Sequence, residues 1–339
     1  MRILDSLRRL IGDFRLRADT LDRRLVENGQ RLDAVEDTLR HRLDALEETL
    51  RQLPTQGGEP CPGHSEPSLP ANVQRDMPYY AMCVQGCTYF YHHGDQIIPS
   101  YMIATGQTFS EENMLAFVRL ADSLFYHGQP PKDGVFLEIG ANIGTTTVYM
   151  KKKCKPELKF LTFEPVEDNA RLLLANCAIN GILPDVTVVH AALSDENRSQ
   201  ATIYVNAENR GGSGLVEGWE GDVPLEETCT LTLDSYLRRQ PAGPIRYAWI
   251  DTEGHEYRVL RGARETFLQR RIPTVLEYNQ GVYRDAGVYE DMLALLGELF
   301  SSFLVCSDVA AGRDAPRPIS ELPLVWEEQQ HLSCDLILF

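Results

Sequence analysis

The chain has 339 residues, of which 43% are hydrophobic, and this is enough for one large domain with an additional segment. The formal net charge is −16, and it is unevenly placed. Residues 1–53 hold eleven Arg and eleven Asp or Glu, which leaves 22 Lys or Arg against 38 Asp or Glu in residues 54–339. An acidic domain repels phosphate backbones, so we expect no nucleic-acid partner and a neutral or cationic ligand.

Eight cysteines are spread through the chain without close even spacing. Charged residues interrupt the N-terminal stretch every few positions, so it does not read as a signal peptide. We therefore expect free thiols and a cytoplasmic location. No run of about 18 apolar residues is present, so we expect no transmembrane segment. Cys83 and Cys87, with His92 and His93 behind them, lack a second ligand pair at finger-like spacing, and we expect no structural zinc.

Residues 18–53 carry apolar side chains at heptad spacing, with one extra four-residue step from Leu39 to Leu43. Asn28 occupies the same seam, where a buried amide often fixes the register of paired helices. Because a helix of this polarity is marginal alone in water, residues 1–53 predict a coiled-coil helix that forms a homo-oligomer through residues 18–53. The alternatives are a lone solvated helix and, for the basic first turns, a membrane-surface helix.

Residues 54–78 are rich in Pro and Gly and predict a linker, so the folded domain is expected at residues 79–339. Strand-like and helix-like runs alternate there, and the strands are expected at residues 135–139, 159–163, 186–190, 247–250 and 274–276. This alternation predicts an α/β fold with a doubly wound parallel sheet. Two last strands, near residues 303–307 and 332–339, have no helix-length pattern between them and predict an antiparallel pair at the edge.

Three smaller features complete the expected domain. Ser110 is expected to cap a helix that runs through Leu124. The aromatic residues within 79–91 predict either a substrate lip or packing at the edge of the domain. The glycine-rich loop 209–221, which contains Trp219, predicts either a lid over a site or a surface loop.

A glycine turn, Gly140-x-Asn142-x-Gly144, follows the strand at 135–139 and precedes a helical pattern. Glycines in such a turn let a ligand approach the backbone, and the N–H groups of the next helix face it with a partial positive charge. A tight structural turn is an equally good explanation of this pattern alone. Dinucleotide-binding turns carry G-x-G-x-x-G, but Asn142 and Thr145 occupy the second and third glycine positions, which disfavours a pyrophosphate site.

Carboxylates follow five successive expected strands: Glu138, Glu164, Asp195, Asp251 and Glu277. Ligands of open parallel sheets bind at the carboxyl ends of the strands, so these side chains predict one shared site. Glu164 lies roughly 20 residues beyond the glycine turn, where a carboxylate accepts hydrogen bonds from both ribose hydroxyls. Asp195, with the backbone of Ala192 and Leu193, is expected beside a purine edge.

Six motifs occur in order: Glu-Ile-Gly-Ala-Asn-Ile-Gly (138–144), Phe-Glu-Pro (163–165), Ala-Leu-Ser-Asp (192–195), Leu-Thr-Leu-Asp-Ser (231–235), Ile-Asp-Thr-Glu-Gly-His-Glu (250–256) and Leu-Glu (276–277). From about Phe109 to Asn279 the chain thereby resembles the FkbM family of S-adenosylmethionine-dependent methyltransferases. The resemblance implies the class I methyltransferase fold, a Rossmann-like sheet of seven strands with an antiparallel last strand. It also implies O-methylation of a hydroxyl on a glycan or another hydroxylated natural product. The chain departs from the family at Glu138, where many members have Asp.

Under this resemblance, the residues after the first three strands hold S-adenosylmethionine: Glu138, Gly140, Asn142, Gly144, Glu164, Ala192, Leu193 and Asp195. The residues after the fourth strand face the methyl group and are candidates for the base and for orienting the acceptor: Asp251, Glu253 and His255. Alternatively, Glu253 only shapes a turn and His255 only packs. Asp251, Glu277 and Asn279 could instead bind Mg²⁺, which we rank below a site without metal.

Two other functions are open on the sequence alone. A nicotinamide-dependent oxidoreductase would use a similar sheet, but the glycines expected after Asn142 are missing. A non-catalytic scaffold would use residues 18–53 for its partners, but it would have no need of carboxylates at five strand ends.

Overall fold

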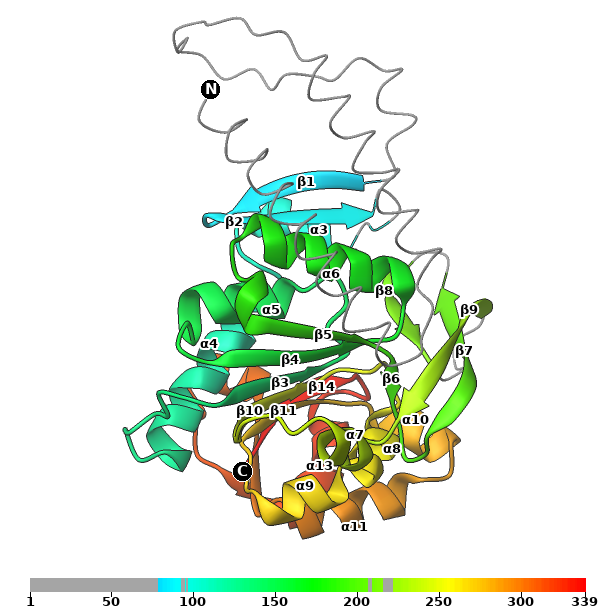
Figure 1. The fold of residues 1–339 in the computed structure, drawn as a ribbon. Helices are drawn as coiled ribbons and strands as arrows, with labels where there is room; N and C mark the ends of the chain where they lie inside the picture. Colours follow the sequence, from blue (N-terminus) through cyan, green and yellow to red (C-terminus); the bar gives the residue numbers. More distant parts are fainter. Residues whose placement is uncertain (1–78, 93–94, 96, 207–208, 216–221) are drawn as a thin grey trace, which may run out of the picture. The chain divides into compact units, whose positions relative to one another are not determined.

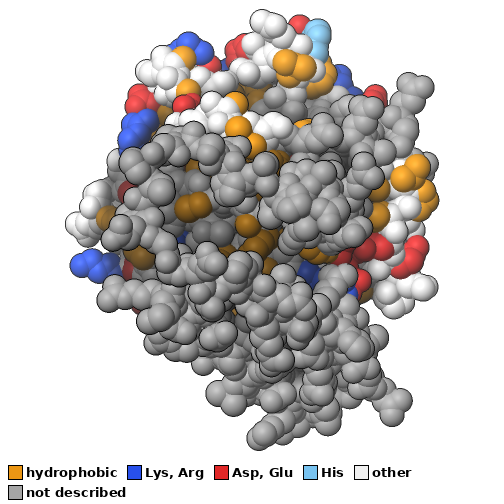
Figure 2. Space-filling model, turned by 90° about the horizontal axis from the view of Figure 1, so that it is seen from above, with side chains coloured by type: hydrophobic (Ala, Val, Ile, Leu, Met, Phe, Trp, Pro, Cys, Tyr) orange, Lys and Arg blue, Asp and Glu red, His pale blue; other side chains and the backbone are white. Residues whose placement is uncertain are grey.

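The computed structural model describes residues 79–339 except 93–94, 96, 207–208 and 216–221 (Figure 1). The expected coiled coil at 1–53, the linker at 54–78 and oligomer formation through residues 18–53 lie outside the described residues and stay predictions. No helix within the described ranges is long and apolar enough to cross a membrane. On the described part of the face in Figure 2, Lys and Arg are scattered among acidic and hydrophobic side chains and form no continuous basic patch.

An eight-stranded sheet forms the centre of the domain, in the order β13-β12-β14-β11-β10-β3-β4-β5. Its strands are β3 (Val135–Ile139), β4 (Lys159–Glu164), β5 (Val186–His190), β10 (Ile245–Ile250), β11 (Thr274–Tyr278), β12 (Ser302–Val305), β13 (Arg317–Pro318) and β14 (Cys334–Leu338). The neighbours from β11 to β5 pair in parallel, as the alternation of strands and helices predicted. Every residue of β3 is buried, which is typical of a parallel strand covered on both faces.

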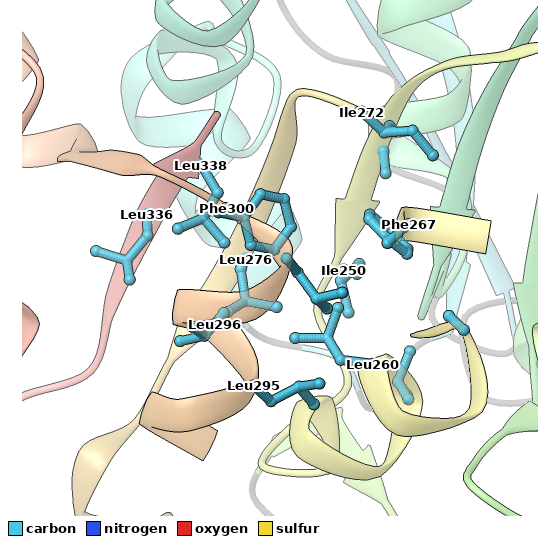
Figure 3. Packing of buried hydrophobic residues seen from close by; sticks show 14 of the residues in the cluster. Ile250, Leu260, Phe267, Ile272, Leu276, Leu295, Leu296, Phe300, Leu336 and Leu338 are labelled. Atoms are coloured by element: carbon cyan, nitrogen blue, oxygen red, sulfur yellow. The ribbon is translucent and has the colours of Figure 1, made fainter. Parts of the chain in front are cut away.

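Helices cover both faces of this sheet (Figure 1). One face carries α3 (Ile97–Thr105), α4 (Glu111–Leu120), α5 (Thr145–Tyr149), α6 (Glu167–Ile179) and α12 (Cys306–Ala310), and the π-helical turns η1 (Ala121–Phe125) and η2 (Met150–Cys154) extend α4 and α5. The other carries α7 (Leu233–Arg239), α8 (Glu256–Gly262), α9 (Arg264–Gln269), α10 (Gln280–Asp285), α11 (Tyr289–Leu299) and α13 (Leu322–Glu328). Successive side chains of β3 point to opposite cores, because Leu137 packs with Leu260 and Leu276 while Phe136 packs on the first face. Figure 3 shows part of the second core, where Leu276 and Leu296 lie beside Phe300.

The antiparallel strand β14 lies between β11 and β12 and pairs with both. The predicted antiparallel pair is therefore present, but its position at the edge was wrong. Leu336, Ile337 and Leu338 are all fully buried, and only an interior position covers three successive apolar side chains on both faces. The edge is formed instead by β13, a two-residue strand that brings the sheet to eight strands rather than the seven that the resemblance implies.

The segment between β12 and β14 was also predicted incorrectly, because it contains α12 and α13 as well as the short 3-10 turn η4 (Ile319–Glu321). Pro323 in the first turn of α13 is a helix-start signal that the sequence offered. Ser110 does not cap α4, because it adopts a left-handed conformation and makes no capping bond. The Glu111 carboxylate instead accepts the backbone N–H of Thr108 at 3.0 Å.

Two smaller sheets complete the described part. The strands β6 (Ala192–Leu193), β7 (Arg198–Asn206), β8 (Asn209–Gly214) and β9 (Asp222–Leu231) form one in the order β6-β9-β7-β8, after β5 and the short turn η3 (Leu183–Asp185). The first part of the expected 209–221 loop is thus a strand. The hairpin of β1 (Tyr79–Val84) and β2 (Cys87–His92) is held to α6, because the Asn180 side chain accepts the backbone N–H of Thr88 at 3.0 Å.

Candidate active site

A cleft lies at the carboxyl ends of β3, β4, β6 and β10, and α3 and β8 add to its walls. The empty space within the cleft, including the part that is open to bulk solvent, is about 1110 Å³. Most of the residues expected from the sequence line this cleft: Gly140, Asn142, Glu164, Ala192, Leu193, Asp251, Glu253 and His255. Glu138, Gly144 and Asp195 lie behind its walls.

The glycine turn after β3 is shaped by close contacts within the protein. Gly140 has φ 83°, and a Cβ atom there would lie 1.7 Å from the backbone oxygen of Asp251. Gly144 has φ 84°, and a Cβ atom there would lie 2.3 Å from Leu173 on α6. The first glycine therefore brings the β3 turn against the loop after β10, and the second lets α6 approach the start of α5.

Glu164, at the end of β4, faces the cleft in a fixed orientation. One carboxylate oxygen accepts the backbone N–H of Asn142 at 2.7 Å, and the other accepts that of Val166 at 2.9 Å. Burial raises the pKa of Glu164 to about 7, against the lowering effect of these two bonds. Each carboxylate oxygen has a second lone pair, so the group can still accept bonds from a ligand.

Glu138 supports the turn from behind. Its carboxylate accepts a hydrogen bond from the Thr147 hydroxyl on α5 and is almost fully buried. Burial raises the pKa of Glu138 to about 8, although the bond from Thr147 opposes this. Glu138 thus links β3 to α5.

Asp195 and His255 are joined through a residue that the sequence analysis did not single out, Ser194. The His255 Nε2 atom lies 2.9 Å from the Ser194 hydroxyl, and Asp195 forms ion pairs with Arg258 and Arg261 of α8. Burial lowers the pKa of His255 to about 4, and the charge of Arg258 acts in the same direction. The ring is therefore neutral at physiological pH.

Three carboxylates meet below the loop after β10. Asp251, Glu253 and Glu277 each place one carboxylate oxygen within 4.8 Å of the others. Burial, with repulsion between the neighbouring carboxylates, raises the pKa of Asp251 well above its usual range and that of Glu277 to about 11. Burial also raises the pKa of Glu253 to about 7. The group therefore holds protons at neutral pH.

Asn279, the third residue of the Mg²⁺ alternative, is used elsewhere. Its side-chain oxygen accepts the backbone N–H of Val282 at 3.3 Å and caps α10. The residue that lies near Asp251 and Glu277 in place of Asn279 is Glu253, which has φ 54° in the tight turn after β10.

The apolar wall of the cleft was not predicted. It contains Ile97 and Ile98 of α3, together with Phe109, Leu215 and Trp249. The described residues of the proposed aromatic lip, 79–92, do not line the cleft, and Tyr89 is buried in the core. Of the proposed lid, Ser213, Gly214 and Leu215 line the cleft, whereas Trp219 lies outside the described residues.

Comparison with known proteins assigns the domain. Residues 138–303 match the family model described as the methyltransferase FkbM domain. The chain carries an FkbM methyltransferase domain. The matched range contains every predicted site residue, whereas the β1–β2 hairpin, α3, α4 and β14 lie outside it.

Relatives of the FkbM domain are distant. Methyltransferase sdnD of Sordaria araneosa is 25% identical over 193 residues, which cover 49% of this chain and 73% of that protein. The methyltransferase FkbM of Methylobacillus flagellatus KT is similar in structure at 13% identity and a TM-score of 0.38. That match covers 65% of this chain and 47% of the other, so this chain spans about half of its length. The N-terminal domain of human METTL16 in complex with SAH is similar at 13% identity and a TM-score of 0.34, over 57% of this chain and 63% of that one.

Proposed function

We propose that this methyltransferase uses S-adenosylmethionine and methylates a hydroxyl of a glycan or another hydroxylated natural product. The observation that carries the proposal is the cleft, in which the cofactor-type residues after β3 and β4 face the acid–base residues after β10. The domain match to the FkbM family supports methyl transfer.

The residues of the cleft fit this cofactor. Glu164 offers ionisable oxygens with free lone pairs to the ribose hydroxyls, and the backbone around Gly140 and Asn142 is open to the cleft for the methionine part. Ala192 and Leu193 line the wall on the adenine side. Three further cofactor-binding residues act from behind these walls in our proposal: Glu138, Gly144 and Asp195. The acidic surroundings suit the positive sulfur.

When bound, S-adenosylmethionine supplies an already activated methyl group, so no electron carrier is required. The residues of the chain would then have to hold the acceptor hydroxyl beside this methyl group and accept the hydroxyl proton. His255 is neutral and lines the cleft, so we assign it the proton. Asp251 and Glu253, whose raised pKa values let them hold a proton, would donate a hydrogen bond to the acceptor oxygen and align it. The apolar wall around Ile98 and Trp249 would hold the body of the acceptor.

Mg²⁺ is an alternative way to bind the acceptor oxygen. Asp251, Glu253 and Glu277 are hard oxygen ligands close enough to share a divalent cation. Our proposal does not need the ion, because the raised pKa values let protons reduce the repulsion between these groups. Cofactor binding should then be independent of Mg²⁺.

Calorimetric titration of the full chain with S-adenosylmethionine and S-adenosylhomocysteine, with and without Mg²⁺ and with NAD as control, tests the proposal. We expect micromolar binding of both adenosyl ligands and none of NAD. Binding of NAD alone would favour the oxidoreductase. A folded protein that binds neither class would favour the scaffold, and cofactor binding only with Mg²⁺ would require the metal.

A further inference from the structure

A hydrogen-bonded chain runs from Asp195 through Ser194 to His255 behind the cleft wall. The Ser194 hydroxyl donates to Asp195 Oδ1 at 3.2 Å, and Ser194 Oγ lies 2.9 Å from His255 Nε2. Ser194 and His255 are both buried. The chain joins the end of β6, on the expected adenine side, to the start of α8, on the expected methyl side.

We propose that Asp195 and Ser194 fix the tautomer of His255, so that its Nδ1 atom presents a lone pair to the cleft. This inference rests on the proposed function, in which His255 takes the acceptor proton. Ser194 and Asp195 are then positioning residues, because they act through His255 and do not touch the acceptor.

The number of hydrogen atoms that Ser194, Asp195 and His255 share determines which ring nitrogen of His255 carries its proton. Ser194 has one hydroxyl hydrogen, and the Asp195 carboxylate can only accept it. With that hydrogen committed to Asp195, Ser194 Oγ must accept from His255, so the ring proton is on Nε2. A neutral imidazole has a single N–H, so Nδ1 carries the lone pair.

The Nδ1 atom is available to a ligand. Within the described part of the chain it has no hydrogen-bond partner, and the Tyr278 hydroxyl is the buried side-chain atom there that lacks one. Nδ1 is therefore not enclosed, and His255 lines the cleft. Because burial keeps the ring neutral, Nδ1 retains a lone pair that can accept a hydrogen bond.

Ion pairs, a backbone hydrogen bond and a close helix contact hold Asp195 and Ser194 in place. The Asp195 carboxylate is anchored by Arg258 at 3.3 Å and Arg261 at 3.2 Å, both on the helix that His255 precedes. The backbone N–H of Ser194 donates to Leu231 at 2.9 Å. A Cβ atom on Gly262 would lie 1.9 Å from the Ser194 backbone oxygen, so only glycine lets α8 approach this closely.

The connectivity also excludes a hydrolase-type serine nucleophile here. In a Ser-His-Asp triad the carboxylate contacts the histidine, and the histidine takes the serine proton. Here the carboxylate contacts the serine, so the serine proton points away from the imidazole.

The test is the tautomer of His255 in the full chain, measured at pH 7 by long-range ¹H–¹⁵N correlation with ¹⁵N-labelled histidine. The spectrum of His255→Gln identifies the signal by its loss. We expect wild type to show the proton on Nε2. Finding the proton on Nδ1 would overturn the inference. Because the tautomer is measured in the wild-type protein, this result does not depend on whether a Ser194 or Asp195 variant folds.

Asp195→Asn provides an inversion test. Its amide oxygen should stay with the two arginines, so its NH₂ group would donate to Ser194 and leave the serine hydrogen free to donate to His255 Nε2. We expect the ring proton to move to Nδ1, and an unchanged tautomer would overturn the inference. Ser235→Ala is the matched control, because Ser235 is a buried serine that bonds to Asn197 and not to His255.

The outcome is independent of the proposed function, because the tautomer is measured without cofactor or acceptor. Titration of the wild-type chain with S-adenosylhomocysteine separates the two, because Asp195 is itself among the proposed cofactor-binding residues. Absent binding with the expected tautomers would contradict the proposed function alone, and normal binding with an unchanged Asp195→Asn tautomer would contradict this inference alone.

Discussion

The backbone N–H of Asn142 donates to the Glu164 carboxylate at 2.7 Å, and this bond joins the turn after β3 to the end of β4. The second bond, from Val166, fixes the other oxygen. The two strand ends that are expected to hold the cofactor are therefore oriented by the protein itself, before any ligand binds. Preorganisation of this kind reduces the entropy that binding must overcome.

Glu164→Gln should weaken the binding of S-adenosylhomocysteine by about 10- to 100-fold, the range expected when a hydrogen bond to a charged group is lost. The amide keeps the size of the side chain, but its NH₂ group must face a backbone N–H. Calorimetry measures the change. Asp234→Asn is the matched control, since Asp234 also accepts two backbone N–H groups, from Glu265 and Thr266 at 2.9 Å, and does not line the cleft. Equal affinities of Glu164→Gln and wild type would remove the ribose assignment.

Cofactor affinity should fall as pH decreases from 8 to 6. The pKa of Glu164 is raised to about 7, so the carboxylate that accepts the ribose hydroxyls is protonated below this value. Binding must then release a proton, and the dissociation constant should rise toward tenfold per pH unit below about 7. Glu253 also lines the cleft with a pKa of about 7, so the comparison with Glu164→Gln assigns the effect. The same pH profile in that variant would exclude Glu164 as its source.

Gly140→Ala should destabilise the fold more than Gly181→Ala. Both glycines have positive φ, 83° and 72°, so both variants lose about 1–2 kcal/mol to backbone strain. Only the Gly140 Cβ collides with backbone, whereas no atom lies within 4 Å of a Cβ on Gly181. We expect a further loss of about 1–3 kcal/mol for Gly140→Ala from the overpacked contact. Denaturant unfolding measures the difference, and equal losses would contradict the close approach to Asp251.

Stability should decrease as pH rises from 5 to 9, and Glu277→Gln should reduce this decrease. The pKa of Glu277 is raised to about 11 in the folded state, so the folded state prefers its protonated form. This preference contributes its full stabilisation below about pH 4.5, the pKa of Glu277 in the unfolded chain. The contribution is lost as the pH rises toward the pKa of Glu277 in the folded state. The upper limit is about 1.4 kcal/mol per pH unit. Melting temperatures of wild type, Glu277→Gln and the exposed control Glu290→Gln test this, and three parallel profiles would contradict it.

Much of the sheet could be predicted, because β3, β4, β5, β10 and β11 are short apolar runs that end in polar turns. The position of β14 could not be predicted in this way, because the choice between edge and interior depends on which strands pair with it. The helix α13 was missed although Pro323 marks its start, since its seven residues are too few to show a helical repeat of apolar positions.

The candidate site could be predicted where one side chain at a strand end has one role, as for Glu164. Contacts between distant segments were not accessible. Ser194 and His255 are 61 residues apart, and nothing in either local pattern indicates that they meet. For the same reason no local pattern indicates that burial lowers the pKa of His255, because burial is a property of the assembled wall.

The interior position of β14 has a consequence for the order of folding. β12 contacts the rest of the sheet through β14, which is made later, so the Phe303–Leu338 and Thr274–Leu338 pairings must form together. During synthesis, the parallel half of the sheet can assemble while β12 is paired with no strand but the two-residue β13. Pairings between segments this far apart in the chain are slow to form. An apolar strand that waits in this way is exposed to aggregation, and α11, which is made before β12 and belongs to the same hydrophobic cluster, offers apolar side chains that could cover it meanwhile.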